Sequence, residues 1–154
     1  MTARFEAVIY SQRLRDLGGL PVRATAGAAA IDLRSCEEGP VTVRPQETHA
    51  FDLGFSVYIK EKGIAGFLLP RSGLGTKGLV LANTMGLIDS DYQGPLKAVA
   101  FNRNPAGGEA ITVNPGDRIF QLVFLPVFLA GLIEVESFSE ETARGAGGYG
   151  STGR

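Results

Sequence analysis

The chain has 154 residues and a formal net charge of −1 at pH 7, a length that fits one domain with a substantial core. Its 15 basic residues form no run, so we expect no nucleic-acid or membrane partner. The single cysteine excludes an internal disulfide and, with the single histidine, a structural zinc site. Nothing near His49 supplies the other members of a Ser-His-Asp triad. The N-terminus has no apolar run long enough for a signal peptide or a membrane span, and we expect a cytoplasmic protein.

Short apolar or alternating segments follow one another between Gly- and Pro-rich turns, a pattern that predicts β-strands. The predicted strands are residues 41–43, 51–59, 64–69, 79–82, 96–101, 111–113, 118–128 and 132–138. No amphipathic stretch is long enough for a full helix, although the SGLGTKG and SEETA segments could each form a turn or so. The many short strands predict an all-β sandwich or barrel, and Pro126 predicts a sheet edge or a bulge.

The segment PRSGLG follows an apolar strand and offers groups that suit an anion. Arg71 has a planar guanidinium that can bind a phosphate with two parallel hydrogen bonds. Ser72 adds a hydroxyl, and glycines such as Gly73 let backbone amides approach closely. The alternative is an ordinary turn with a surface arginine.

The segment GLIDSDYQG places two carboxylates and an aromatic ring in a predicted glycine-bounded hairpin. Because Leu87 and Ile88 are expected to draw the chain into the core, Asp89 would be partly desolvated and able to act as a general base. Tyr92 offers a flat face to a sugar or a base. The alternative is a hairpin whose aspartates, Asp89 and Asp91, cap their own turn.

Two further segments have a functional and a structural interpretation. In AIDLRS, alternation places Asp32 on the face opposite Ile31 and Leu33, where it could simply be solvated. In PGDRIFQL, Gln121 could bond a phosphate oxygen or face water, and Asp117 and Arg118 are expected in a turn and on the surface.

The last eleven residues, RGAGGYGSTGR, resemble a phosphate cradle without a scaffold. GAGGYG fits G-x-G-x-x-G, but that motif needs a preceding strand and a following helix, and here the printed chain ends. The tail is therefore either a disordered stub or a segment that closes over a site built elsewhere.

In their order along the chain, AIDL, PRSGLG, GLIDSDYQG, GDRIFQL and RGAGGYGSTG resemble the five motifs of the trimeric dUTP pyrophosphatases (dUTPases). This resemblance covers essentially the whole chain. It implies a distorted jelly-roll (β-clip) barrel over residues 1–143, a homotrimer with sites at subunit interfaces, and an arm over residues 144–154 that closes over a neighbour's site. The implied reaction hydrolyses dUTP to dUMP and pyrophosphate, which keeps uracil out of DNA and supplies dUMP for dTMP synthesis. Mg²⁺ would be held mainly by phosphates and water, without a direct protein ligand.

The resemblance also implies roles for individual residues. Asp89 would activate the attacking water, Asp32 would support the catalytic arrangement, and Gln121 would lie near the α-phosphate. Phosphate contacts are implied for Arg71, Ser72 and Gly73, uracil or sugar contacts for Asn83, Gly86, Ile88 and Tyr92, and tail contacts for Arg144, Tyr149, Gly150, Ser151 and Thr152. Of the tail residues, Tyr149 would stack on uracil, while Arg144, Ser151 and Thr152 would hold the γ-phosphate.

Two residues depart from the family pattern. Ala30 stands where a glycine is common, and it would cost about 1 kcal/mol or more if that position needed a positive φ. Phe120 stands where alanine is usual, and alternation turns it away from Gln121, so we expect altered packing and unchanged chemistry.

Two other functions are possible alternatives for a chain of this kind. A dCTP deaminase of the same fold needs a glutamate in the strand after the hairpin, and residues 94–104 contain none. A non-catalytic nucleotide sensor on a retired scaffold would be expected to lose the base or the arm. Asp89, Arg71, Gln121 and the tail are all present.

Overall fold

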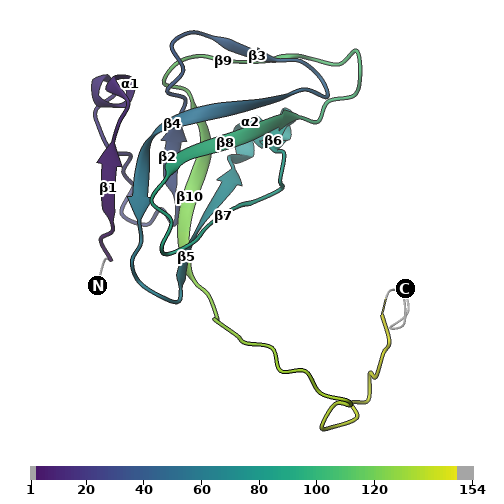
Figure 1. Ribbon diagram of the computed structural model, residues 1–154. Helices are drawn as coiled ribbons and strands as arrows, with labels where there is room; N and C mark the ends of the chain where they lie inside the picture. The colour runs from purple at the N-terminus through teal and green to yellow at the C-terminus, as the bar shows by residue number, and fades with distance from the viewer. Residues whose placement is uncertain (1–2, 149–154) are drawn as a thin grey trace.

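Two four-stranded antiparallel sheets make up the fold of the computed structural model, which describes residues 3–148 (Figure 1). The first sheet has the strand order β1 (Glu6–Ile9), β4 (Thr48–Tyr58), β8 (Pro95–Asn102) and β6 (Leu79–Leu81). The second has the order β2 (Ile31–Arg34), β10 (Arg118–Pro126), β5 (Ile64–Pro70) and β7 (Gly86–Ile88). A separate pair, β3 (Val41–Val43) and β9 (Ile111–Val113), closes one end of the molecule (Figure 1). The all-β prediction is confirmed.

One core lies between the two sheets because each strand turns its apolar side inward. In β8, for example, Leu96 and Ala98 are buried while Lys97 and Val99 face solvent. Side chains of both sheets join one buried cluster that includes Leu33, Phe51, Leu53, Leu79, Ile119 and Leu122. Phe120 is fully buried in this cluster. Its large side chain therefore packs within the core, on the side away from Gln121.

Most predicted strands match observed ones within a few residues, and the exceptions are informative. The expected hairpin over GLIDSDYQG is wrong: β7 pairs with β5 in one sheet, whereas β8 pairs with β4 and β6 in the other. Pro126 is indeed at an edge, because β2 reaches only as far as Leu122 and leaves one side of Pro126 without a neighbouring strand.

Helices are limited to two short ones among the described residues. The helix α2 (Ser72–Thr76) coincides with the turn expected in SGLGTKG, whereas only the end of SEETA enters a turn, in which the N–H of Gly145 donates to the carbonyl of Thr142 at 2.9 Å. The helix α1 (Gln12–Asp16) was not predicted from the sequence, and the hydroxyl of Ser11 caps its first turn. Neither helix is long enough to cross a membrane.

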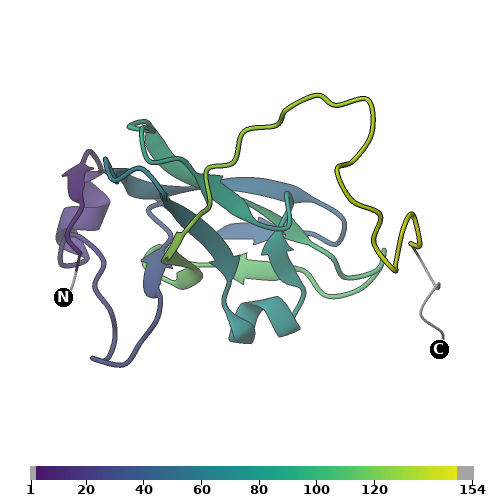
Figure 2. The same cartoon turned by 90° about the horizontal axis from the view of Figure 1, so that it is seen from below.

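After β10 the backbone N–H of Val127 still donates to the carbonyl of Gly63 at 2.8 Å, and the chain then leaves the barrel (Figures 1 and 2). The strand predicted at 132–138 is wrong for the single chain, since residues 127–148 contain neither strand nor helix. The apolar residues of this segment are nevertheless exposed to solvent: Phe128 by 96%, Leu132 by 100%, Ile133 by 87% and Phe138 by 91%. Residues 132–138 alternate as a strand would, but no segment of the described chain pairs with them.

Candidate active site

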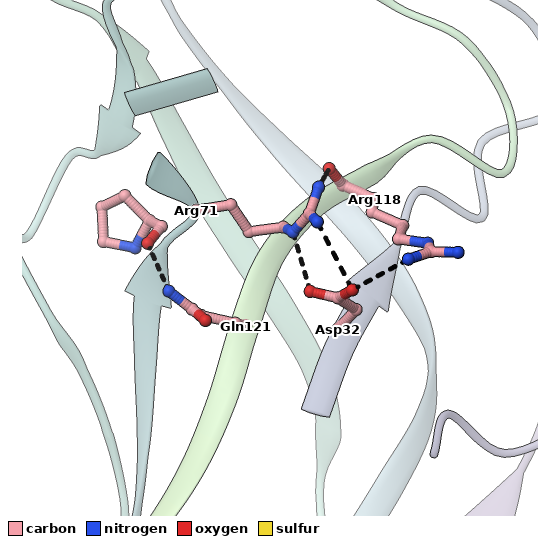
Figure 3. Close-up of polar contacts among 5 residues, drawn as sticks. Asp32, Arg71, Arg118 and Gln121 are labelled. Carbon is pink, nitrogen blue, oxygen red and sulfur yellow. Dashed lines mark hydrogen bonds and ion pairs between the residues drawn. The ribbon is translucent and has the colours of Figure 1, made fainter. Parts of the chain in front are cut away.

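A carboxylate shared by two arginines lies where β2, β5 and β10 come together (Figure 3). Asp32 of β2 accepts two bonds from Arg71, at 2.7 Å from Nε to Oδ1 and 3.4 Å from Nη2 to Oδ2. Arg118 of β10 binds the same Oδ2 through Nη1 at 3.2 Å. The Asp32 side chain is only 22% exposed, so the interpretation of a simply solvated aspartate is wrong.

The charge of this cluster does not cancel, because one carboxylate faces two guanidinium groups. Arg71 also donates from Nη1 to the backbone carbonyl of Arg118, at 3.2 Å. Three of its five N–H donors are then engaged and two remain for a ligand. One positive charge is left in excess at a half-exposed position, which favours the binding of an anion.

Arg118 is the member of this cluster that sequence reasoning missed. It was expected to be an ordinary surface residue, and it is in fact exposed, but it also binds Asp32. The pairing of β10 with β2 brings the two together, since Gln121 lies opposite Asp32 and Arg118 opposite Arg34, with a register shift between Arg118 and Phe120. No local sequence signal reveals that register.

Gln121 holds the start of the loop that follows β5. Its amide Nε2 donates to the carbonyl of Pro70 at 2.9 Å, and the side chain is half-buried (Figure 3). Arg71 comes next, then α2, where Ser72 and Gly73 are both exposed and accessible to a ligand. Asp32 and Gln121 therefore both hold this loop, one through Arg71 and the other through Pro70.

A second group of predicted residues surrounds β7. Asn83 is exposed in the tight turn before it, where Thr84 adopts a positive φ of 63°. Gly86 and Ile88 are buried and pair with β5, and a Cβ on Gly86 would come within 2.9 Å of Leu68. The backbone of this strand thus packs closely against its neighbour.

Beyond β7 lie the proposed base and the aromatic ring. Asp89 is exposed, so the expectation of a partly desolvated carboxylate is wrong for the isolated chain, and Asp91 is exposed as well. The ring of Tyr92 is oriented by its hydroxyl, which donates to the carbonyl of Pro95 at 3.1 Å, and it leaves no room for a Cβ on Gly94.

Asp89 and the Asp32–Arg71 pair lie at opposite ends of β5. Because β7 runs antiparallel to β5, Ile88 faces Gly66, and Asp89 continues away from Arg71. The five steps from Gly66 to Arg71 span about 16 Å at a strand rise of about 3.3 Å per residue. The single chain thus brings Asp32, Arg71 and Gln121 together and keeps Asp89 apart from them.

The C-terminal site residues are described only in part. Arg144 is exposed, and its Nε donates to the carbonyl of Gly147 at 2.9 Å. Tyr149, Gly150, Ser151 and Thr152 lie outside the described residues.

Ala30 is not among the residues with positive φ, so the strain considered for this position does not arise. Within residues 3–148, no three His, Cys, Asp or Glu side chains gather in a way that could hold a metal ion. Asp32 is already surrounded by arginines and suits no cation.

The comparisons with known proteins agree on one family. A family model described as dUTPase matches residues 18–153. A deoxyuridine 5'-triphosphate nucleotidohydrolase of Coxiella burnetii is 48% identical over 155 residues, covering 100% of this chain and 99% of that protein. One of Legionella pneumophila is 50% identical over 147 residues, covering 95% and 94%.

Solved structures give the same result for the fold. A Staphylococcus bacteriophage 80alpha dUTPase mutant with dUpNHpp superimposes with a TM-score of 0.83 at 28% identity, over 99% of this chain and 100% of that chain. A phage phi11 dUTPase mutant, described with a structural Mg(II) ion, gives 0.75 at 27% identity over 90% and 100%. With a family model, relatives at about half identity and the fold all in agreement, the chain belongs to the dUTPase family.

Proposed function

We propose that this chain hydrolyses dUTP to dUMP and pyrophosphate, with Asp89 as the base that activates water. The relatives named deoxyuridine 5'-triphosphate nucleotidohydrolase support the substrate. The observation that carries the proposal is the Asp32–Arg71–Arg118 cluster, whose excess positive charge lies at the start of an exposed loop. A triphosphate is the ligand that most needs such charge.

In the proposed reaction, Asp89 takes a proton from a water molecule, whose oxygen bonds to the α-phosphorus. The bond from that phosphorus to the oxygen bridging it to the β-phosphorus breaks, and pyrophosphate leaves with the bonding electrons. Arg71 stabilises the charge that develops on the phosphate oxygens, Ser72 and Gly73 bind phosphate beside it, and Gln121 contacts the α-phosphate. Asp32 keeps the Arg71 guanidinium in place between turnovers.

Magnesium is the proposed cofactor, and the phi11 structure's description of a structural Mg(II) ion shows that a relative binds this metal. Bound to the triphosphate, it would neutralise phosphate charge and orient the chain of phosphates. We propose that phosphate oxygens and water supply its ligands, without a direct protein ligand.

We infer that the working site is shared between subunits of a homotrimer. Asp89 and Arg71 lie at opposite ends of β5, so a site that uses both is completed by a second copy. The exposed apolar residues after β10, Phe128, Leu132, Ile133 and Phe138, support the same inference, because isolated proteins rarely expose so many large apolar side chains together. The same assembly would cover Asp89, which is exposed in one chain.

Recognition of the nucleoside is assigned to the segment around β7. The backbone of Asn83, Gly86 and Ile88 would select uracil, since fixed donors and acceptors distinguish it from cytosine, and a rigid wall excludes the methyl group of thymine. The anchored ring of Tyr92 would pack under deoxyribose and leave no room for a 2′-hydroxyl. The bacteriophage relative bound to dUpNHpp is consistent with a deoxyuridine nucleotide ligand.

The arm of residues 144–154 would close over the site of a neighbour once substrate is bound. Arg144, Ser151 and Thr152 would bind the γ-phosphate, with Gly150 beside them, and Tyr149 would stack on uracil. A glycine-rich segment loses much entropy when it orders, so closure depends on the charged contacts that a triphosphate offers.

The buried Cys36 forms no disulfide, which is in keeping with the predicted reducing cytoplasm.

The test is pyrophosphate release in the presence of Mg²⁺, with dUTP, dTTP, dCTP and UTP compared in parallel. We expect release from dUTP alone. Asp89→Asn should bind dUTP and turn over at least ~10²-fold more slowly, because it removes the only proposed base. Asp91→Asn is the matched control, since Asp91 is also exposed two residues away and should stay near wild type.

Near-normal turnover in Asp89→Asn would contradict the assignment of the base. Ammonia released from dCTP would indicate the deaminase alternative, although β8 and the rest of residues 94–104 lack the glutamate that this chemistry needs. Binding of dUTP without any release would indicate a sensor.

A further inference from the structure

The end of the α2 loop is held by a corner of the chain that carries no motif residue. This corner, Arg103 and Asn104, follows β8 directly. The guanidinium of Arg103 donates from Nη2 to the carbonyl of Gly75 at 3.2 Å, and its backbone N–H donates to the carbonyl of Gly78 at 3.0 Å. Asn104 donates from Nδ2 to the carbonyl of Lys77 at 3.1 Å. Three backbone carbonyls at the end of the loop thus receive bonds from this corner.

The corner is itself fixed to the core. The backbone N–H of Asn104 donates to Oδ1 of Asn102 at 3.1 Å, and Asn102 is completely buried. The Asn102 amide in turn donates to the carbonyls of Val43 and Glu109, at 2.9 and 3.0 Å. A buried amide whose nitrogen and oxygen are both hydrogen-bonded keeps one geometry. The bond to Asn102 therefore fixes the position of Asn104 relative to the barrel.

The loop needs such support because α2 cannot hold its own shape. A helix of five residues is too short to be stable in water, and α2 has no side-chain cap at its start and no buried residue. Its start is held by Gln121 and Asp32 through Pro70 and Arg71.

At its other end Gly78 adopts a φ of +111°, and any Cβ there would collide with the Asn104 side chain. The loop is therefore held at both ends, by the predicted site residues at one and by the Arg103–Asn104 corner at the other.

We infer that Arg103 and Asn104 are positioning residues, which set the place of the Arg71–Ser72–Gly73 segment for substrate phosphate without touching the substrate. This inference rests on the proposed function, because it takes that segment to be the phosphate-binding loop. Loss of the corner lets α2 shift and weakens phosphate contacts in the bound and transition states alike. Such uniform weakening raises KM for dUTP and leaves kcat nearly unchanged.

The test compares Arg103→Met, Arg103→Lys and Asn104→Ala with the wild-type protein. Arg103 is exposed, so Arg103→Met keeps most of the apolar stem, removes the donor and should fold normally. We expect its KM for dUTP to rise about fivefold, the factor that one net hydrogen bond typically contributes. Arg103→Lys retains an N–H for Gly75 and should stay within about twofold of wild type. Asn104→Ala should raise KM at least as much.

Two comparisons separate positioning from general damage. Arg15→Met is the matched control, since Arg15 is also exposed and donates to a backbone carbonyl, that of Ile9, far along the chain from α2. Deoxyuridine has no phosphate, so its inhibition constant should be the same in every variant. An inhibition constant that rises together with KM would show a general distortion and overturn the inference.

Arg71→Met separates this inference from the function on which it rests. If Arg71→Met raises KM and neither Arg103→Met nor Asn104→Ala does, the corner does not position the loop, and the phosphate role of the loop stands. If Arg71→Met leaves KM unchanged, the loop is not the phosphate site, and the proposed function fails at that point.

Discussion

Asp32 shows how one side chain can prepare a site without touching the reacting atoms. It restrains two guanidinium groups that would otherwise repel each other, and it fixes Arg71 through two of its nitrogen atoms. Because Arg71 lies at the start of α2, the direction of its guanidinium and the position of the loop depend on the same carboxylate.

Replacing Asp32 by asparagine should therefore impair substrate binding more than folding. The side chains involved are 22% to 46% exposed, so the loss of stability should be on the order of 1 kcal/mol or less. We expect KM for dUTP to rise about tenfold, because the Arg71 guanidinium loses its anionic partner. Glu37→Gln is the control: its pair with His49 has similar exposure, 24% and 35%, and its loss should leave KM unchanged. An equal effect of both variants would contradict the role of Asp32.

Two side chains, Cys36 and Tyr10, are expected to make the fold less stable at high pH. Burial, together with the charge of Asp52, raises the pKa of the Cys36 thiol to about 11 from an ordinary value of 9.0. Burial also raises the pKa of Tyr10, whose hydroxyl donates to Asp52 at 2.6 Å. Both groups bind protons more tightly in the folded chain than in the unfolded one, so their contribution to stability is complete below about pH 9 and falls as the pH rises towards 11.

We expect the urea midpoint to be lower at pH 10.5 than at pH 8, followed by circular dichroism. The double variant Cys36→Ala, Tyr10→Phe should lose less of its own midpoint over the same interval, since neither site can then ionise. A midpoint that falls equally in both proteins would assign the pH dependence to other groups.

At the scale of elements, seven of the eight strands predicted from the sequence are confirmed, and each of them has its partner strand in the same chain, although β1, β2 and β7 were not among the predicted strands. The period-2 alternation of residues 96–101 and the apolar run of residues 64–69 predict β8 and β5 within a residue or two. The same reasoning fails at residues 132–138, which alternate equally well but find no partner strand in their own chain. Alternation indicates that a segment can form a strand. It does not reveal which strand, in the same chain or in another copy, would pair with that segment.

Site residues, like strands, were predicted where the local sequence carries the signal and missed where strand pairing decides their position. The five motifs identify Asp32, Arg71 and Gln121, and the structure brings these three together. Arg118 could not be predicted because it meets Asp32 only through the register of β10 against β2. The hairpin expected around Asp89 was wrong because local turn residues do not reveal that β7 and β8 join different sheets.

The C-terminal arm is the element whose contributions to function and to stability should differ most. Its described part, up to Gly148, is largely exposed and adds no residue to the buried core. Deleting residues 144–154 should therefore abolish turnover of dUTP and leave the melting temperature nearly unchanged, because the proposed phosphate and uracil contacts are lost without loss of core. Pyrophosphate release and thermal unfolding measure the two effects. A large drop in melting temperature would show that the arm is structural.

At the scale of the whole molecule, the separation of Asp89 from Arg71 along β5 makes the proposed function depend on assembly. At a dUTP concentration far below the raised KM of Arg71→Met, this variant and Asp89→Asn should each show little activity alone, yet mixing the two proteins after joint unfolding and refolding should restore activity. If a site takes Asp89 from one subunit and Arg71 from its neighbour, random association in a closed trimer leaves about a quarter of the sites intact. Pyrophosphate release from dUTP by the mixture, compared with each variant refolded alone, measures this recovery. Refolding either variant with the double variant is the control and should restore nothing. A mixture no more active than its components would mean that each subunit builds its own site.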